Sequence, residues 1–208
     1  MNEILPGVFH WTTQHEKWGI DIHSYYLTDA DGGVLIDPRV PEEGVEWFRR
    51  HGEPHDILLT NRHHYRHSGE LAGAYGATVR CHRAGMHEFT SGEEVEPFAA
   101  GDDFPNGFLA IEIGVLCPEE TAFHTVREAG ILAIGDAVIR EGDLRFVSDE
   151  YMGEDPEGVK AGLRESLGRL VEEHDFRHVL LAHGEPIVGG GREALARFVG
   201  KRKETAGS

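Results

Sequence analysis

Short apolar runs alternate with polar, glycine-rich segments along this chain, and their lengths indicate which elements they form. The runs at 57–59, 131–134 and 179–182 are apolar at successive positions, as expected for strands that are covered on both faces of a sheet. The segment 156–173 instead repeats its apolar residues at helical spacing, from Val159 to Val171. It therefore predicts an amphipathic helix.

The order of the predicted elements defines the fold class. Strands are expected at 8–11, 24–28, 33–37, 56–60, 77–81, 108–113, 121–124, 131–136 and 178–182. Helices are expected at 41–50, 70–75, 156–173 and 192–199, with a short helical piece around Met86. Strands followed by βα units, twice over, predict an α+β protein: a four-layer αβ/βα sandwich in which two mixed β-sheets are flanked by helices. We expect residues 1–208 to form a single domain.

The composition is that of a globular protein, and the charge narrows the choice of partners. The 208 residues are 39% hydrophobic and 27% charged, with a formal net charge of −17. Such a surface repels phosphate backbones and anionic lipids, so we expect a small-molecule substrate or ligand, no nucleic acid and no membrane. The chain shows no membrane-length apolar run and no signal-peptide pattern at its start, so we expect a cytoplasmic protein. Whether it forms a homo-oligomer stays open.

Candidate chemistry gathers where apolar strands end. His63 follows the run 57–59, Asp136 follows 131–134, and His183 follows 179–182. Strand-end loops could bring these two imidazoles and one carboxylate to a single point, and zinc, iron(II) and manganese favour such ligands. His67 lies four residues after His63 and would share its face if the loop is helical, so it is a candidate fourth ligand.

Several short motifs occur in a fixed order along nearly the whole chain. They are Leu-Ile-Asp-Pro at 35–38, the strand and loop around Thr60, Pro-Glu-Glu-Thr-Ala at 118–122, Ile-Gly-Asp at 134–136 and Leu-Ala-His-Gly-Glu-Pro at 181–186. Together they resemble the metallo-β-lactamase superfamily. The resemblance implies its αβ/βα fold and a metal-dependent hydrolase, with Asp136 as the bridging aspartate and His183 as the final histidine ligand.

The chain departs from that family in the loop after Thr60, which in the family reads Thr-His-x-His-x-Asp-His. The two first family histidines fall on Asn61 and His63, while the Asp and the last His fall on Tyr65 and Arg66. A tyrosine, whose ordinary pKa is about 10, cannot replace the Asp at neutral pH. Arg66 places a permanent positive charge where a metal ligand would lie, and it could pair with Asp136 or bind a substrate carboxylate. A standard dinuclear centre is therefore not expected.

Two hypotheses follow. In the first, one divalent metal (zinc, iron or manganese) is bound and supports hydrolysis of a small ester, thioester, lactone or amide. In the second, no metal is bound, and the protein is an inactive member that binds a small, anionic ligand or serves as an interaction scaffold. The candidate metal ligands are His63, Asp136, His183 and His67, and the candidate catalytic residues are Asp136, Tyr65 and Arg66. We also expect residues 140–156 to cover the cleft, with Phe146, Tyr151 and Met152 lining it.

Overall fold

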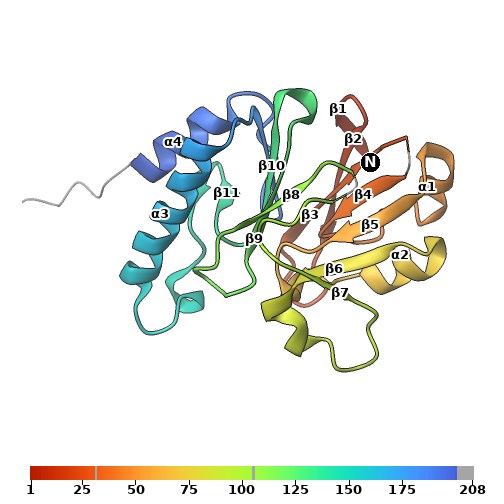
Figure 1. Ribbon diagram of the computed structural model, residues 1–208, viewed down its shortest axis with the longest axis horizontal. Coiled ribbons are helices and arrows are strands. Elements are labelled where there is room, and N and C mark those ends of the chain that lie inside the picture. The colour runs from red at the N-terminus through yellow and green to blue at the C-terminus, as the bar shows by residue number, and fades with distance from the viewer. Residues whose placement is uncertain (31, 105, 201–208) are drawn as a thin grey trace, which may run out of the picture.

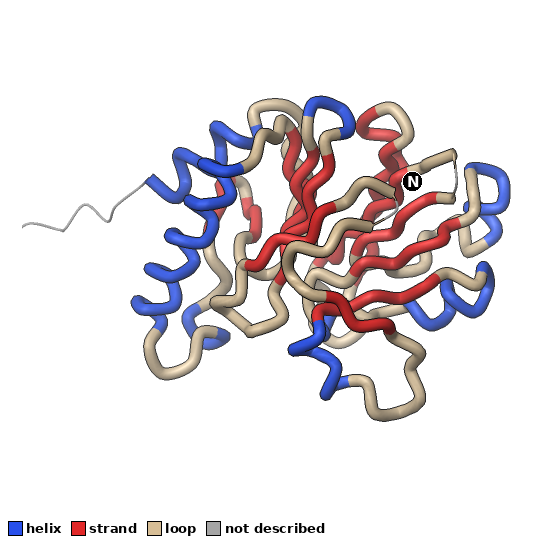
Figure 2. The backbone as a smooth tube through the Cα atoms, viewed as in Figure 1, coloured by secondary structure: helices blue, strands red, loops and turns tan. Residues whose placement is uncertain are grey.

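Two β-sheets pack face to face in the computed structural model, and helices cover the outer face of each (Figure 1). The structure describes residues 1–30, 32–104 and 106–200. Figure 2 shows the resulting layers, with the strands in the middle and the helices outside. The predicted four-layer αβ/βα sandwich is therefore confirmed.

The first sheet has seven strands in the order of the sequence. They are β1 (Asn2–Leu5), β2 (Val8–Gln14), β3 (Asp21–Leu27), β4 (Gly33–Ile36), β5 (Pro54–Leu58), β6 (Thr78–His82) and β7 (Glu96–Phe98). Strands β1 to β4 pair antiparallel, and β4 to β7 pair parallel. The sheet is therefore mixed, and the carboxyl ends of β4 and β5 lie together at one edge.

The second sheet has four strands in the order β13-β10-β9-β8. They are β8 (Leu109–Glu112), β9 (Thr121–Thr125), β10 (Ile131–Ile134) and β13 (His178–Leu181). Strands β10 and β13 are parallel, whereas β9 is antiparallel to both of its neighbours. A separate two-stranded ribbon consists of β11 (Ile139–Glu141) and β12 (Asp143–Arg145).

Each sheet has its own pair of helices. The helices are α1 (Glu46–His51) and α2 (Ser68–Tyr75) beside the first sheet, and α3 (Pro156–Glu173) and α4 (Gly191–Gly200) beside the second (Figure 1). Helix α3 has the predicted bounds, whereas α1 begins later than the predicted start at residue 41. The reason is a turn in which the Gly44 amide donates to the Pro41 carbonyl and Gly44 takes a φ of +74°, a conformation that the helix cannot contain.

Alternation within the strands divides the apolar side chains among three layers. In β4, Val34 and Ile36 belong to the core between the sheets, while Leu35 packs with α1 and α2. In β10, Ile131 and Ala133 face the same central core, while Leu132 and Ile134 pack under α3 and α4. Both faces of these strands are buried, which explains why they appear in the sequence as continuous apolar runs.

One side chain ties the two sheets together near the site. The hydroxyl of Tyr25 on β3 donates to the carbonyl of Leu181 at 2.8 Å and accepts from the amide of Leu181 at 3.1 Å. Close by, the amide of His23 donates to the carbonyl of Ala182 at 3.1 Å. The end of β13 is thus fixed against the middle of the first sheet. Among the described residues, no helix is both long and apolar enough to cross a membrane.

Candidate metal centre

The loop after β5 carries the histidines, and a cap sets the direction of each one. A short 3-10 helix covers Arg62–His64, and the side-chain oxygen of Asn61 accepts a hydrogen bond from the His63 amide at 3.0 Å. An Asn at this position is a preferred helix N-cap. The resulting turn buries His64, which is 4% exposed, and leaves His63 at the surface.

Asp37 holds the inward-facing His64 in place. Its carboxylate accepts from the Thr60 amide at 2.8 Å and from the Thr60 hydroxyl at 2.7 Å, and it lies 3.0 Å from Nδ1 of His64. Burial alone would raise the pKa of Asp37, but the His64 imidazole and Arg66 hold it below its usual range. The Nδ1–H of His64 therefore points to a carboxylate, which leaves Nε2 free to face the other way.

Asp136 and His183 complete the group. Oδ1 of Asp136, just after β10, lies 3.2 Å from Nε2 of His64 and 3.0 Å from Nε2 of His183, just after β13. One ligand atom from each of the three residues lies within 4.8 Å of the others. The two imidazoles hold the pKa of Asp136 well below its usual range, against the effect of burial. Burial and Arg66 oppose protonation of His64, yet Asp136 and Asp37 raise its pKa to about 9.

A buried acid lies behind this group. The Asn61 amide donates to Oδ2 of Asp136 at 3.0 Å and to Oε2 of Glu120 at 3.1 Å, and the Ala137 amide donates to Oε1 of Glu120 at 3.1 Å. Burial and the nearby Asp136 charge raise the pKa of Glu120 to about 8. Gly135 permits this close packing, because a Cβ there would lie 2.4 Å from the Thr60 hydroxyl.

The structure brings together two of the predicted site residues, Asp136 and His183, and adds His64 in the position beside them. His63 is exposed. The predicted fourth ligand, His67, faces the loop after β4, where its Nδ1 accepts from the Val40 amide at 3.0 Å. The sequence signal that could have singled out His64 is Asn61, an N-cap residue that starts a turn at a defined position.

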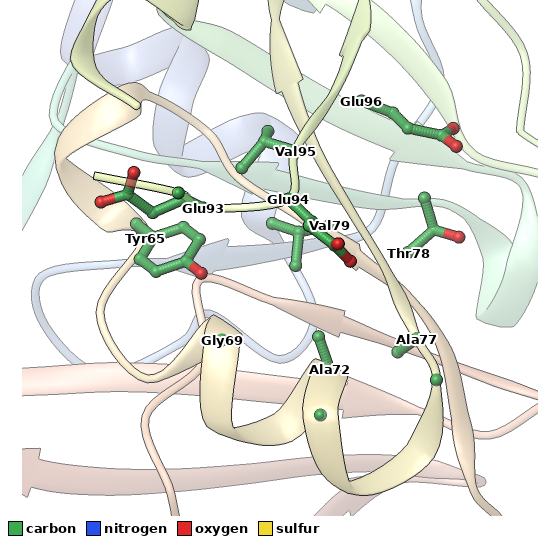
Figure 3. Close-up of a pocket in the computed structure, with 13 residues that line it drawn as sticks. Tyr65, Gly69, Ala72, Ala77, Thr78, Val79, Glu93, Glu94, Val95 and Glu96 are labelled. Carbon is green, nitrogen blue, oxygen red and sulfur yellow. The ribbon is translucent and has the colours of Figure 1, made fainter. Parts of the chain in front are cut away.

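Within the described residues, neither Arg66 nor Tyr65 hydrogen-bonds to the three clustered side chains, although the Arg66 charge acts on His64. Nη1 of Arg66 donates to the carbonyls of Asp37 at 2.7 Å and His23 at 3.3 Å, so this residue supports the backbone around the site. Its φ of +46° is a costly conformation for a residue with a long side chain. The Tyr65 ring packs against Phe89 at a centroid distance of 5.6 Å. Tyr65 also lines a cavity of about 580 Å³ between α2 and residues 92–96 (Figure 3).

The segment expected to line the cleft contributes to the core instead. Phe146 and Met152 are buried with the side chains under α3, and Phe146 stacks edge-on against Phe198 at 4.7 Å. Tyr151 is 69% exposed. The prediction that Phe146 and Met152 line a cleft is wrong, because the second sheet needs them to fill the space beside α3 and α4.

The donor set suits a divalent metal. Two imidazole nitrogens and one carboxylate oxygen converge, and such mixed sets hold zinc, iron or manganese. The Asp37–His64 hydrogen bond is the kind of outer contact that orients a ligating imidazole in metal sites. The side chains of Asp136 and His183 are 24% and 21% exposed, so the group can be reached from solvent.

Known structures share this fold. No family model matches the sequence, and no curated protein matches it. TTHA1429, a metallo-beta-lactamase family protein from Thermus thermophilus, is 19% identical with a TM-score of 0.69, and the match covers 95% of this chain and 79% of that one. TTHA1623, solved in a di-iron-bound form, is 23% identical with a TM-score of 0.68 over 90% of this chain and 97% of that one.

A third match comes from an archaeon. ST1585, a metallo-beta-lactamase superfamily protein from Sulfolobus tokodaii, is 14% identical with a TM-score of 0.64, over 93% of this chain and 84% of that one. The chain therefore has the metallo-β-lactamase fold, which confirms the resemblance first seen in the sequence motifs. The three-residue candidate ligand group lies within this fold.

Proposed function

We propose that this protein is a metal-dependent hydrolase with a mononuclear site that acts on a small ester, thioester, lactone or amide. The ligands in this proposal are His64, Asp136 and His183, with zinc, iron or manganese as the ion. The observation that carries it is the orientation of His64, whose Nδ1 is held by Asp37 while Nε2 faces Asp136 at 3.2 Å. We prefer His64 to the predicted His63 because His63 is exposed.

The chain's own groups have defined parts in this proposal. A bound divalent ion would supply a lowered pKa for a coordinated water and polarise a substrate carbonyl. To hold an ion, His64 would offer Nε2 without its proton, and the Asp37 carboxylate would keep the remaining proton on Nδ1. The Asn61 amide restrains Oδ2 of Asp136 at 3.0 Å, which leaves Oδ1 directed at the two imidazoles.

The test compares adjacent histidines. Protein purified without a chelator or a histidine tag is analysed by elemental mass spectrometry, alongside His64→Ala and His63→Ala. We expect His64→Ala to lower the bound zinc, iron or manganese by about one ion per chain and His63→Ala to leave it unchanged. Hydrolysis of a panel of esters, thioesters and lactones should then be lost in His64→Ala and after chelation. Equal metal content in wild type and His64→Ala would overturn the proposal.

The alternative is an inactive member that binds a small anionic ligand or serves as an interaction scaffold. One observation favours it: Asp136 already has two imidazole partners, and His64 has a pKa of about 9. A protonated His64 neutralises the carboxylate, so the group is balanced without an ion. No metal after reconstitution, together with binding of a small carboxylate that His183→Ala abolishes, would support this alternative.

A further inference from the structure

A second group of ligand-type side chains lies outside the proposed centre. His10 on β2, His23 on β3 and Glu185 after β13 each offer one atom, and these atoms lie within 4.8 Å of one another. The group shares no side chain with His64, Asp136 and His183. The two groups are therefore distinct sets of ligand atoms.

The pairing of β2 with β3 places the two histidines on one face. His10 lies opposite Tyr25, and His23 lies opposite Thr12, so the two imidazoles are diagonal neighbours across the pair. Both are almost fully buried, at 4% and 3% exposure. The hydrogen bond from the His23 amide to the Ala182 carbonyl brings the end of β13 alongside. Glu185, three residues further on, then reaches the pair from a surface loop.

The geometry between the two rings is close to what an ion needs. Nε2 of His10 and Nδ1 of His23 are 2.8 Å apart, and the ring planes differ by 4°. One nitrogen donates the single shared proton and the other accepts it. Two imidazole nitrogens bound to one tetrahedral zinc, each at about 2.0–2.1 Å, lie roughly 3.3 Å apart. If the two nitrogens moved apart by about a further half ångström, an ion would fit in place of the shared proton, on the side of Glu185.

The surroundings favour the neutral imidazoles that bind metals. Burial lowers the pKa of His10 and of His23 to about 4, so neither ring is charged at neutral pH. Glu185 is exposed, which leaves one side of the group open to solvent. Two imidazoles and a glutamate form a known three-ligand set for zinc with an open position.

We infer that His10, His23 and Glu185 bind a second divalent cation of the zinc class. This ion would link β2 and β3 to the loop that carries His183, two residues before Glu185. It would thus restrain that loop.

The test uses the full chain stripped of metal and titrated with Zn²⁺, with bound ions counted by elemental mass spectrometry after desalting. The double variant His64→Ala/Asp136→Asn removes the first centre and should retain about one ion per chain. Adding Glu185→Gln should weaken that remaining site by about 100-fold or more, since loss of a ligand exceeds the 10–100-fold effect of outer contacts. Asp21→Asn is the matched control, because it removes an exposed negative charge near His23 without removing a ligand; we expect a change below about 3-fold.

Two outcomes would overturn the inference. The first is a double variant that binds no Zn²⁺ although its thermal unfolding shows that it is folded. The second is equal affinity with and without Glu185→Gln, which would make the histidine pair a hydrogen-bonded link between strands. If the double variant does not fold, the single variant Glu185→Gln decides: it should hold one Zn²⁺ fewer than wild type. If Glu185→Gln binds one ion fewer than wild type and His64→Ala binds as many ions as wild type, the result supports this site and contradicts the proposed function.

Discussion

Replacing Asp37 by asparagine should weaken both the fold and the proposed metal site. Asp37 is 1% exposed, and its carboxylate receives the Thr60 amide, the Thr60 hydroxyl and Nδ1 of His64. Asparagine has the same shape and tolerates the φ of +48° at this position. The substitution therefore tests the charge and the acceptor rather than the packing.

The expected loss of stability follows from the hydrogen bonds that the Asp37 carboxylate accepts. An amide nitrogen in place of Oδ2 cannot accept from His64 or from the Thr60 hydroxyl, so two of the three hydrogen bonds to this side chain are lost. The charge-assisted one from His64 alone costs about 1.5–3 kcal/mol. Removing one partner of a buried ion pair costs up to about 3–5 kcal/mol. Between these two figures, we expect a loss of about 2–4 kcal/mol in the free energy of unfolding. His64 must also move its proton to Nε2, which should lower metal affinity about 10–100-fold.

Urea unfolding and Zn²⁺ titration of the same samples measure both effects. Glu96→Gln is the matched control, because Glu96 lies on β7 in the same sheet and its side chain is 63% exposed where it pairs with Arg80 at 2.7 Å. Such a pair contributes about 0–1 kcal/mol, and metal affinity should not change. If Asp37→Asn alters stability by less than about 0.5 kcal/mol, which is the scale of a neutral surface substitution, and leaves affinity unchanged, the reasoning about His64 is refuted.

Four further substitutions test the packing and the pH dependence. Gly135→Ala should cost about 1–3 kcal/mol, because the new Cβ would overpack against Thr60. Gly168→Ala in α3 should instead stabilise the protein by about 0.5–1 kcal/mol, because its Cβ would meet nothing within 4 Å. Thermal unfolding compares the two variants. Leu163→Ala, in the core under α3, should cost about 2–5 kcal/mol in urea unfolding. Burial lowers the pKa of His178, whose Nδ1 accepts from the Gly189 amide. The unfolded chain therefore binds more protons below its ordinary pKa of about 6.5, and stability falls as the pH drops from about 7 to about 5. The free energy of unfolding of His178→Gln should fall less over this range than that of wild type. An equal fall in both proteins would contradict the attribution of this pH dependence to His178.

The strands were predictable because burial on both faces requires apolar side chains at consecutive positions, as at Leu132 and Ile134. Asp136 and His183 could be singled out for the same reason, since each closely follows such a strand. The choice between His63 and His64 could not be made by counting from Thr60. It depends on the Asn61 cap and on an Asp37 contact 27 residues away.

The second histidine pair could not be predicted from the sequence for another reason. Its formation depends on the register in which Thr12 lies opposite His23. A shift of one residue would turn one imidazole to the other face of the sheet. The sequence alone does not fix that register, because residues 15–20 between β2 and β3 form a connection longer than a two-residue hairpin turn.

The contact between Tyr25 and Leu181 determines when the three-residue group can form during synthesis. The two residues are 156 positions apart, so during synthesis the hydroxyl of Tyr25 has no partner until nearly the whole chain has emerged. The loop with His64 can form early, but the arrangement with Asp136 and His183 must await the last strand, and closing so long a loop is slow. A ribosome-bound intermediate should thus be unable to capture metal at the three-residue group. Amide exchange at Leu181 would report when the two sheets join.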